Sequence, residues 1–166
     1  MIKMIKLIGS VLIVFAGAKT GFMKAGQLDK QLEGTRLVIH ILNDVKIMLE
    51  SSFLTTDEII ERLESDGEYK KTGLFCFSES GFTKDELCEN IDKCQYITDK
   101  NDRERLKAYF LQLGTTDITG EISKTDLCIG DFKNREEVCK EKVRKYSKLY
   151  RGLGILGGAM TAVILM

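Results

Sequence analysis

The chain is apolar at both ends and charged in between. Residues 7–18 form an unbroken run of apolar or small residues, and residues 152–166 form a second run that ends at the last residue. Most of the 25 Lys and Arg residues and the 25 Asp and Glu residues lie between them. A hydrocarbon core about 30 Å thick requires about 20 helical residues, so each run alone also fits a buried core helix. Extended to residues 1–24 and 150–166, each is just long enough, and we expect two transmembrane helices.

A secretory signal peptide is the main alternative for the first segment. Lys3 and Lys6 precede the apolar run, and the run ends in residues 16–18, Ala-Gly-Ala, which is similar to a cleavage site. Most basic residues that flank the two runs lie instead on the side of the middle region: Lys19, Lys24, Arg144, Lys145, Lys148 and Arg151. Lys and Arg concentrate on the cytoplasmic side of membrane proteins. We therefore favour two membrane helices, with the middle region cytoplasmic and both termini outside.

Small residues recur at helical spacing in both terminal segments. Gly17 and Gly21 are four residues apart, and so are Gly154 and Gly158. In lipid, such faces allow two helix backbones to approach closely and gain dispersion contacts. The alternative is that glycine is simply common in membrane helices. We expect these four glycines to pack the two terminal helices together, and association between copies of the chain is left open.

The middle region, residues 25–149, is predicted to be one helical domain. The chain has no proline, and Thr, Asp, Asn and Gly divide the region at intervals typical of helix caps. Thr55 with Glu58, and Thr83 with Glu86, have the spacing of a capping box. A helical apolar stripe over residues 27–52 consists of Leu28, Leu32, Ile39, Leu42, Val45 and Leu49. A further helix is expected over residues 99–113, whereas residues 74–77 fit either a helix or a strand.

The longest periodic pattern begins at Ile118. From there, mainly apolar residues recur at alternating steps of four and three as far as Tyr150. The same spacing continues through Leu153, Gly157 and Met160. This spacing predicts a single long helix that continues into the membrane, with Gly130 as the place where it could kink. The predicted fold class is therefore all-α, a helical bundle between an N-terminal and a C-terminal transmembrane helix.

Neither composition nor motifs indicate catalysis. The formal net charge is zero, which argues against nucleic-acid binding. His40 is the single histidine, and we expect it at a surface or core boundary on a helix. No C-x-x-C pair or phosphate-binding glycine loop is present. We expect no cofactor, no metal site and no enzymatic activity, and we interpret Cys88, Cys94 and Cys139 as small core residues. The five cysteines of the chain are Cys76, Cys88, Cys94, Cys128 and Cys139.

Three patches resemble the stage III sporulation protein AB family. Residues 6–17 with Gly21 and Phe22 are similar to the opening segment of that family. Leu113, Gly114, Thr116 and Asp117, with Glu121, are similar to its L-G-x-S-D motif before the last long helix. Tyr150 and Arg151 open a segment similar to its C-terminal Y-R-S-L-G motif.

The resemblance implies a mother-cell component of the channel that links the mother cell to the forespore. It implies a location in the cytoplasmic membrane on the mother-cell side of the forespore envelope, among other channel components. The soluble part of this family is similar to the F-type platform domain of type II secretion machines. A cytoplasmic sporulation ATPase is the implied partner, and the implied role is a non-enzymatic adaptor. The family usually has prolines and an acidic pair near the corner that corresponds to residues 48–56. This chain has neither there, so the resemblance does not indicate which surface would bind the ATPase. A regulatory membrane protein whose helical domain sequesters a soluble partner is the alternative.

Overall fold

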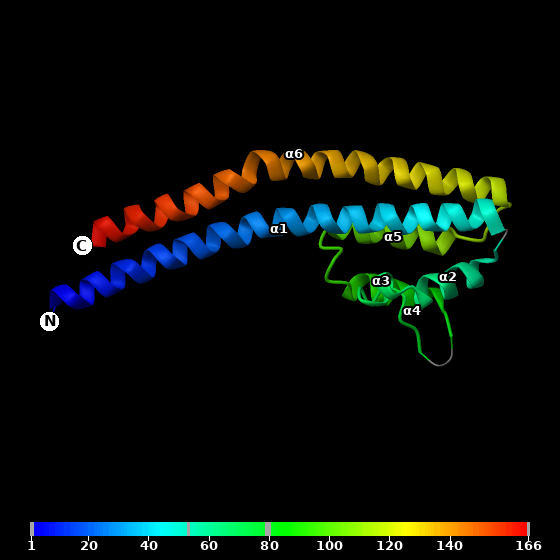
Figure 1. Ribbon diagram of the computed structural model, residues 1–166, viewed down its shortest axis with the longest axis horizontal. Helices are drawn as coiled ribbons and strands as arrows, with labels where there is room; N and C mark the ends of the chain where they lie inside the picture. The colour runs from blue at the N-terminus through cyan, green and yellow to red at the C-terminus, as the bar shows by residue number, and fades with distance from the viewer. Residues whose placement is uncertain (1, 53, 79–80, 166) are drawn as a thin grey trace. The chain divides into compact units, whose positions relative to one another are not determined.

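The computed structural model describes residues 2–52, 54–78 and 81–165, and these residues fold as helices joined by turns and loops. No strand occurs in these ranges, which confirms the predicted all-α class. The helices are α1 (Ile2–Ser52), α2 (Thr56–Ser65), α3 (Gly67–Lys70), α4 (Lys84–Lys93), α5 (Lys100–Gln112) and α6 (Ile118–Leu165) (Figure 1).

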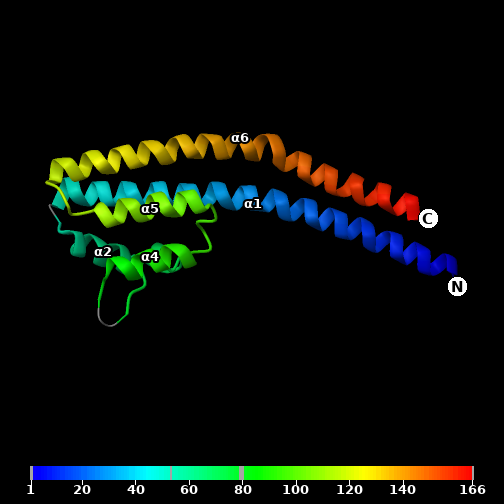
Figure 2. The same cartoon turned by 180° about the vertical axis from the view of Figure 1, so that it is seen from behind.

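The chain divides into two compact units. Unit 1 consists of residues 1–32 and 138–166, and unit 2 consists of residues 33–137. Within each unit, α1 and α6 run antiparallel and side by side, as both Figure 1 and Figure 2 show. Unit 2 also contains α2 to α5, with α5 beside α1 and α6 and with α2, α3 and α4 gathered together.

Unit 2 encloses one apolar core to which all six helices or their connections contribute. Its largest fully buried side chains include Tyr69, Phe75 and Phe132. The rings of Tyr69 and Phe75 pack edge to face at a centroid distance of 6.1 Å, and those of Phe75 and Phe110 do so at 5.9 Å. Such aromatic pairs add about 0.5–1.5 kcal/mol each to the free energy gained by burial. These three aromatic rings therefore connect α3 and the turn that follows it with α5.

The buried face of α1 in unit 2 differs slightly from the predicted stripe. Leu42, Val45 and Leu49 are buried as expected, but Ile39 is only partly buried. Val38 and Ile41 are fully buried in its place. The reason is geometric: residues 38, 41, 42, 45 and 49 follow steps of three and four along one face of a helix, and Ile39 lies about 100° away from Val38.

One of the two predicted capping boxes is complete. Thr55 accepts a hydrogen bond from the Glu58 N–H, and the Glu58 carboxylate accepts one from the Thr55 N–H at 2.7 Å. Thr83 likewise accepts from the Glu86 N–H at 3.2 Å. The Glu86 carboxylate, however, accepts from the Ser78 N–H at 3.0 Å. Glu86 thus holds the loop before α4 instead of closing the second box.

Residues 74–77 are neither a helix nor a strand. Leu74 and Phe75 lie in a turn, and Cys76 and Phe77 lie in irregular backbone. Gly73, in the same turn, has a φ of 70°, and the Leu74 N–H donates to the Thr72 hydroxyl at 3.2 Å. Leu74 and Phe75 are nonetheless almost fully buried. The apolar run therefore serves the core without regular secondary structure.

The long final helix is confirmed, because α6 is continuous from Ile118 to Leu165. Its predicted face holds in the first half, where Thr125, Ile129, Phe132 and Cys139 are buried. Beyond Cys139 the same face is not covered, since Leu153 and Met160 are exposed. Ser147 and Gly158 are buried instead. The contact face there consists of small residues because the backbones of α1 and α6 approach too closely for large side chains.

Candidate functional site

The two helices of unit 1 meet through the four predicted glycines. A Cβ atom added to Gly17 would lie 2.8 Å from the Gly154 carbonyl oxygen and 2.9 Å from the Gly158 Cα. One added to Gly154 would lie 2.7 Å from the Gly17 carbonyl oxygen and 2.9 Å from the Gly21 Cα. Distances below 3.0 Å are not tolerated by real Cβ atoms. The structure thus brings Gly17, Gly21, Gly154 and Gly158 together, and any side chain at the contact would force the helices apart.

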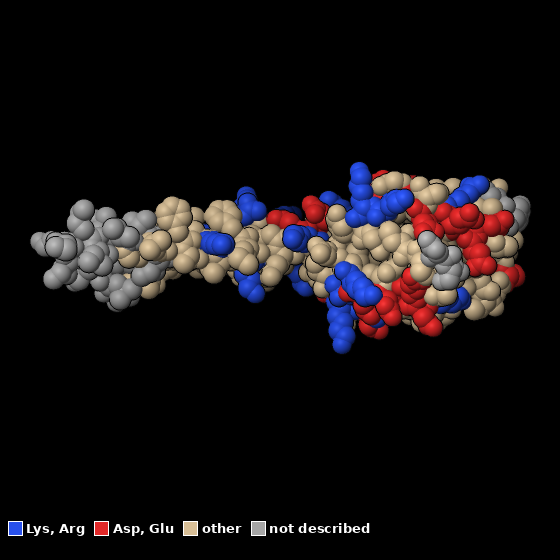
Figure 3. Space-filling model, turned by 90° about the horizontal axis from the view of Figure 1, so that it is seen from below, with Lys and Arg blue, Asp and Glu red and all other residues tan. Residues whose placement is uncertain are grey.

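Large apolar side chains cover the outside of the same helix pair. On α1 they are Leu12, Phe15, Phe22 and Met23, and on α6 they are Leu153, Ile155, Leu156, Met160 and Val163. Val163 is 74% exposed and Phe15 is 70% exposed. Figure 3 shows mainly uncharged side chains on this face of unit 1, with Lys and Arg among them. This arrangement, with small residues at the helix contact and large apolar residues on the outside, is the reverse of that in a helix pair packed in water.

The structure does not confirm the two predicted membrane spans. Among the residues that it describes, no helix combines the length and the apolar character needed to cross a membrane. Much of the first predicted span, over residues 1–24, falls on side chains outside the description, namely those of residues 1–8, 10, 11 and 13. The end of the second predicted span, over residues 150–166, likewise falls on side chains outside the description, those of residues 162 and 164–166.

Tyr150 and Arg151, the third family patch, lie in unit 1 beside the glycine contact. A Cβ atom on Gly21 would meet the Tyr150 carbonyl group. The Arg151 guanidinium lies 5.8 Å from the centroid of the Phe22 ring and 3.5 Å from the Asp29 carboxylate. The arginine therefore links α6 to α1 through a cation–π contact and an ion pair.

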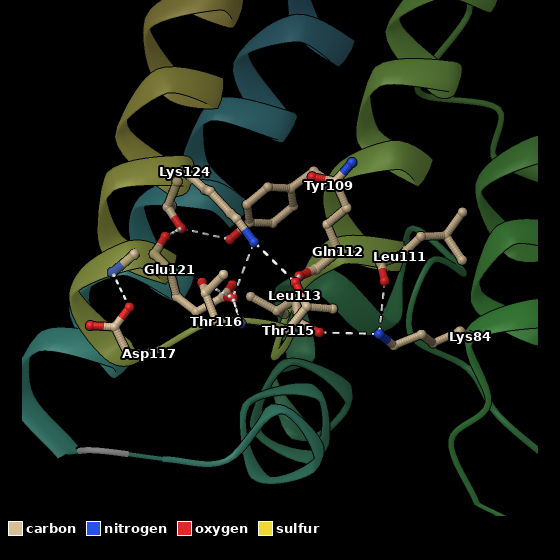
Figure 4. A network of polar contacts seen from close by, with 12 residues as sticks. Lys84, Tyr109, Leu111, Gln112, Leu113, Thr115, Thr116, Asp117, Glu121 and Lys124 are labelled. Atoms are coloured by element: carbon tan, nitrogen blue, oxygen red, sulfur yellow. Dashed lines mark hydrogen bonds and ion pairs between the residues drawn. The ribbon is translucent and has the colours of Figure 1, made fainter.

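The second family patch forms the corner between α5 and α6 in unit 2 (Figure 4). Leu113 is buried, and Gly114 follows it with a φ of 81°, a left-handed conformation that favours glycine. The Asp117 carboxylate accepts from the Gly120 N–H at 3.3 Å and so caps the first turn of α6. These residues reverse the chain direction within a few positions.

Glu121 is the buried centre of this corner. Its residue exposure is 3%, and its Oε1 accepts hydrogen bonds from the Thr116 N–H at 2.8 Å and from the Thr116 hydroxyl at 2.6 Å. Lys124 Nζ lies 3.4 Å from the same oxygen. Burial alone would raise the pKa of this carboxyl group, but the Thr116 hydrogen bonds, the Gly114 N–H and Lys124 outweigh it and lower the pKa. Among the described residues, Glu121 Oε2 makes no hydrogen bond.

Further hydrogen bonds connect this corner to α4 and α5. The Thr125 hydroxyl donates to the Glu121 carbonyl at 2.7 Å, and the Tyr109 hydroxyl donates to Thr125 Oγ1 at 2.9 Å. Lys84 Nζ donates to the carbonyls of Leu111 and Leu113, at 2.9 and 3.1 Å (Figure 4). Residues far apart in the sequence thus hold the α5–α6 corner in place. Sequence reasoning missed Lys84 and Tyr109, because no local pattern relates them to the corner.

Ion pairs, one of them to the buried Asp102, hold α6 against α1 and α5 in unit 2. Glu136, which interrupts the apolar pattern of α6, accepts from Arg36 Nε at 2.8 Å. Arg135 contacts Asp99, and its Nε lies 3.2 Å from Asp102 Oδ1. Burial raises the pKa of the Asp102 carboxyl group, and Arg135 offsets part of that increase. Charged side chains of α6 thus make tertiary contacts with α1 and α5.

Neither the histidine nor the cysteines form a reactive constellation in the described part of the chain. The exposed His40 ring contacts the Tyr69 hydroxyl, which also donates to Asp44. Cys94 and Cys139 are buried, as expected of small core residues, whereas Cys88 is only partly buried. Burial raises the pKa of the Cys128 thiol to about 11, which keeps it protonated and unreactive near neutral pH. No group of three or more candidate metal ligands occurs among the described residues.

These features define an all-helical protein that combines a charged bundle with a glycine-packed helix pair. A family model described as stage III sporulation protein AB matches residues 6–166, and the chain belongs to this family. The match assigns the protein a role in sporulation and agrees with the three sequence patches. No curated protein and no solved structure matches the chain.

Proposed function

We propose that this protein is a non-enzymatic platform of the channel between mother cell and forespore. In this role it couples a cytoplasmic secretion-type ATPase to the membrane assembly, together with other channel components. Its membership of the sporulation family supports the process. The similarity of that family's soluble part to F-type platform domains supports the coupling role.

The observation that carries the proposal is the helix pair of unit 1. Its contact face is glycine, and its outer face presents large apolar side chains such as Phe15, Leu156 and Met160. In water, exposure of this apolar surface would be unfavourable by a free energy of about 25 cal/mol per Å². In lipid, the same side chains are solvated and the close backbone contact stabilises the pair. We infer that unit 1 attaches the protein to the membrane.

Unit 2 is suited to a water-exposed role. Its core is closed, and ion pairs such as Lys46 with Asp126, at 2.7 Å, cover its surface. Figure 3 shows acidic and basic side chains next to one another on this unit. We place unit 2 on the cytoplasmic side of the mother-cell membrane. An alkaline phosphatase fusion at Glu64 should then be inactive, and high activity would contradict this placement.

Membrane attachment is tested by membrane fractionation after alkaline extraction. The double variant Phe15→Gln/Leu156→Gln should shift the protein from the membrane to the soluble fraction. The matched control Ile47→Gln/Leu127→Gln removes two equally exposed apolar side chains from unit 2 and should stay with the membrane. If the native chain is recovered as a soluble protein after detergent-free lysis, the attachment is wrong.

The coupling role is tested by co-purification from detergent. The intact chain should retain a hexameric ATPase, and a strain that lacks the gene should fail to complete sporulation. Retention of a single soluble regulator in place of an ATPase would support the sequestering alternative. Normal sporulation of the deletion strain would remove the platform role.

A further inference from the structure

We propose that a basic collar on unit 1 binds the phosphate groups of anionic phospholipids and thereby sets the depth of the helix pair at the membrane surface. The collar consists of Lys19, Lys24, Arg144, Lys145, Lys148 and Arg151, all of which are exposed. The proposal rests on the membrane attachment proposed above and adds a lipid class to it.

Close backbone contacts bring the two parts of the collar to one level of the helix pair. A Cβ atom on Gly21 would meet the Tyr150 carbonyl and would lie 3.0 Å from the Gly154 Cα. Lys19 and Lys24 flank Gly21 on α1, and Lys148 and Arg151 flank Tyr150 on α6. Lys19, Lys24, Lys148 and Arg151 therefore surround the pair at nearly the same height. Arg144 and Lys145 follow on α6, about 8–9 Å from Tyr150 along the helix axis.

The collar has few acidic partners in its own unit. In residues 19–32 and 138–151 there are nine Lys and Arg residues, but Asp29 and Glu141 are the only acidic ones. Asp29 pairs with Arg151. Within the described part of the chain, Lys19, Lys24 and Lys148 form no ion pair, and the same holds for Arg144. Lys145 lies over the Tyr146 ring at 5.4 Å.

Many basic residues of unit 2 are instead paired with acidic ones. Lys46 pairs with Asp126 at 2.7 Å, and Lys107 pairs with Asp92 at 2.7 Å. In Figure 3, red and blue side chains adjoin on unit 2, whereas the blue side chains of unit 1 are set mainly among uncharged ones. The contrast indicates that the positive charge of the collar is neutralised by a group outside the chain.

The neighbours of the collar identify that group as a lipid headgroup and not a nucleic acid. Exposed Phe22 and Leu153 adjoin the collar, and the Tyr146 and Tyr150 rings lie 6.3 Å apart beside it. Basic and aromatic residues next to a large apolar surface are typical of the boundary between headgroups and acyl chains. A nucleic acid would neutralise the charge but leave the adjoining apolar side chains in water.

The test measures co-flotation of the purified full-length chain with vesicles of two compositions. One contains only a zwitterionic phospholipid, and the other also contains phosphatidylglycerol. The native chain should partition about tenfold or more in favour of the anionic vesicles, since each nearby Lys or Arg contributes to attraction by an anionic surface. High salt should abolish that preference because it screens exposed charges.

Three variants separate the collar from general effects of charge. Arg144→Gln/Lys145→Gln/Lys148→Gln should lose the preference for anionic vesicles. The matched control Lys71→Gln/Lys100→Gln/Lys133→Gln removes the same charge from exposed sites of unit 2 and should keep it. The charge-retaining variant Arg144→Lys/Lys145→Arg/Lys148→Arg should keep it too, and circular dichroism verifies that each variant is helical.

The outcomes distinguish the collar from membrane attachment itself. Flotation of the native chain with zwitterionic vesicles at high salt reports attachment through the apolar surface alone. If the native chain floats but shows no preference for anionic lipid, or if both glutamine variants lose the preference equally, the collar proposal is overturned and attachment stands. If the chain does not float at high salt, the attachment proposed above fails instead. Displacement from anionic vesicles by duplex DNA at equal phosphate concentration would assign the collar to nucleic acid and overturn the lipid proposal.

Discussion

Gly17 and Gly154 place the backbones of α1 and α6 in direct contact. A Cβ atom on Gly154 would lie 2.7 Å from the Gly17 carbonyl oxygen, and one on Gly17 would lie 2.8 Å from the Gly154 carbonyl oxygen. The relationship is reciprocal, so neither residue can change alone without moving a helix. It also explains why the large residues of this part of α6 face outward.

Gly154→Ala should therefore destabilise the helix pair by about 1–3 kcal/mol, the usual cost of overpacking. Gly157→Ala is the matched control on the same helix, because nothing lies within 4 Å of its added Cβ. There alanine should be neutral or stabilising by up to about 1 kcal/mol through helix propensity. Thermal unfolding in detergent, followed by circular dichroism, measures both. Equal midpoints for the two variants would mean that the contact is not tight.

Gly114→Ala tests the α5–α6 corner. The left-handed conformation there, with a φ of 81°, costs alanine about 1–2 kcal/mol, and the added Cβ would also meet the Thr56 hydroxyl. Gly73 has a φ of 70° but open space around it, so Gly73→Ala should show the conformational cost alone. In urea unfolding, Gly114→Ala should lose more stability than Gly73→Ala, and Thr56→Ala should reduce the difference.

Glu121 should make the stability of the corner depend on pH. Its folded pKa is lowered, so its ionised form contributes stability above about pH 4.3, the ordinary value for an unfolded chain. That contribution is lost as the pH falls through the folded pKa. Glu121→Gln should therefore lower the unfolding free energy near neutral pH and flatten its decline at acid pH. Exposed Glu61→Gln serves as the control, and an unchanged acid profile in Glu121→Gln would refute the expectation.

Arg135 should be costly to remove because Asp102 is buried beside it. Arg135→Met leaves that carboxylate without its partner, and breaking such a pair typically costs about 3–5 kcal/mol. Burial has raised the pKa of Asp102, so protonation at lower pH should relieve part of the loss. Urea unfolding at several pH values measures this. Adding Asp102→Leu should recover stability, and a double variant less stable than Arg135→Met alone would count against a charge effect.

Local sequence patterns predicted much of the fold. The capping box at Thr55 and the N-cap at Thr83 lie where expected, and α5 begins directly after Asp99. These signals are reliable because a cap is a contact between residues three or so positions apart. The pattern of α6 predicted a continuous helix but not which of its faces is covered beyond Cys139. Which face of a helix is covered depends on its neighbour, and there the neighbour presents glycine.

The amino-acid sequence by itself determined that the chain is helical, where most helices begin, and that α6 is continuous, because these follow from propensity, capping and periodicity within a few residues. It also carried the family patches. Only the tertiary structure decided that Glu121 is the buried centre of the α5–α6 corner, that Glu136 pairs with Arg36, and that the large apolar residues of unit 1 face outward around the predicted glycine contact. Each of these depends on contacts between distant segments, whose geometry no local pattern specifies.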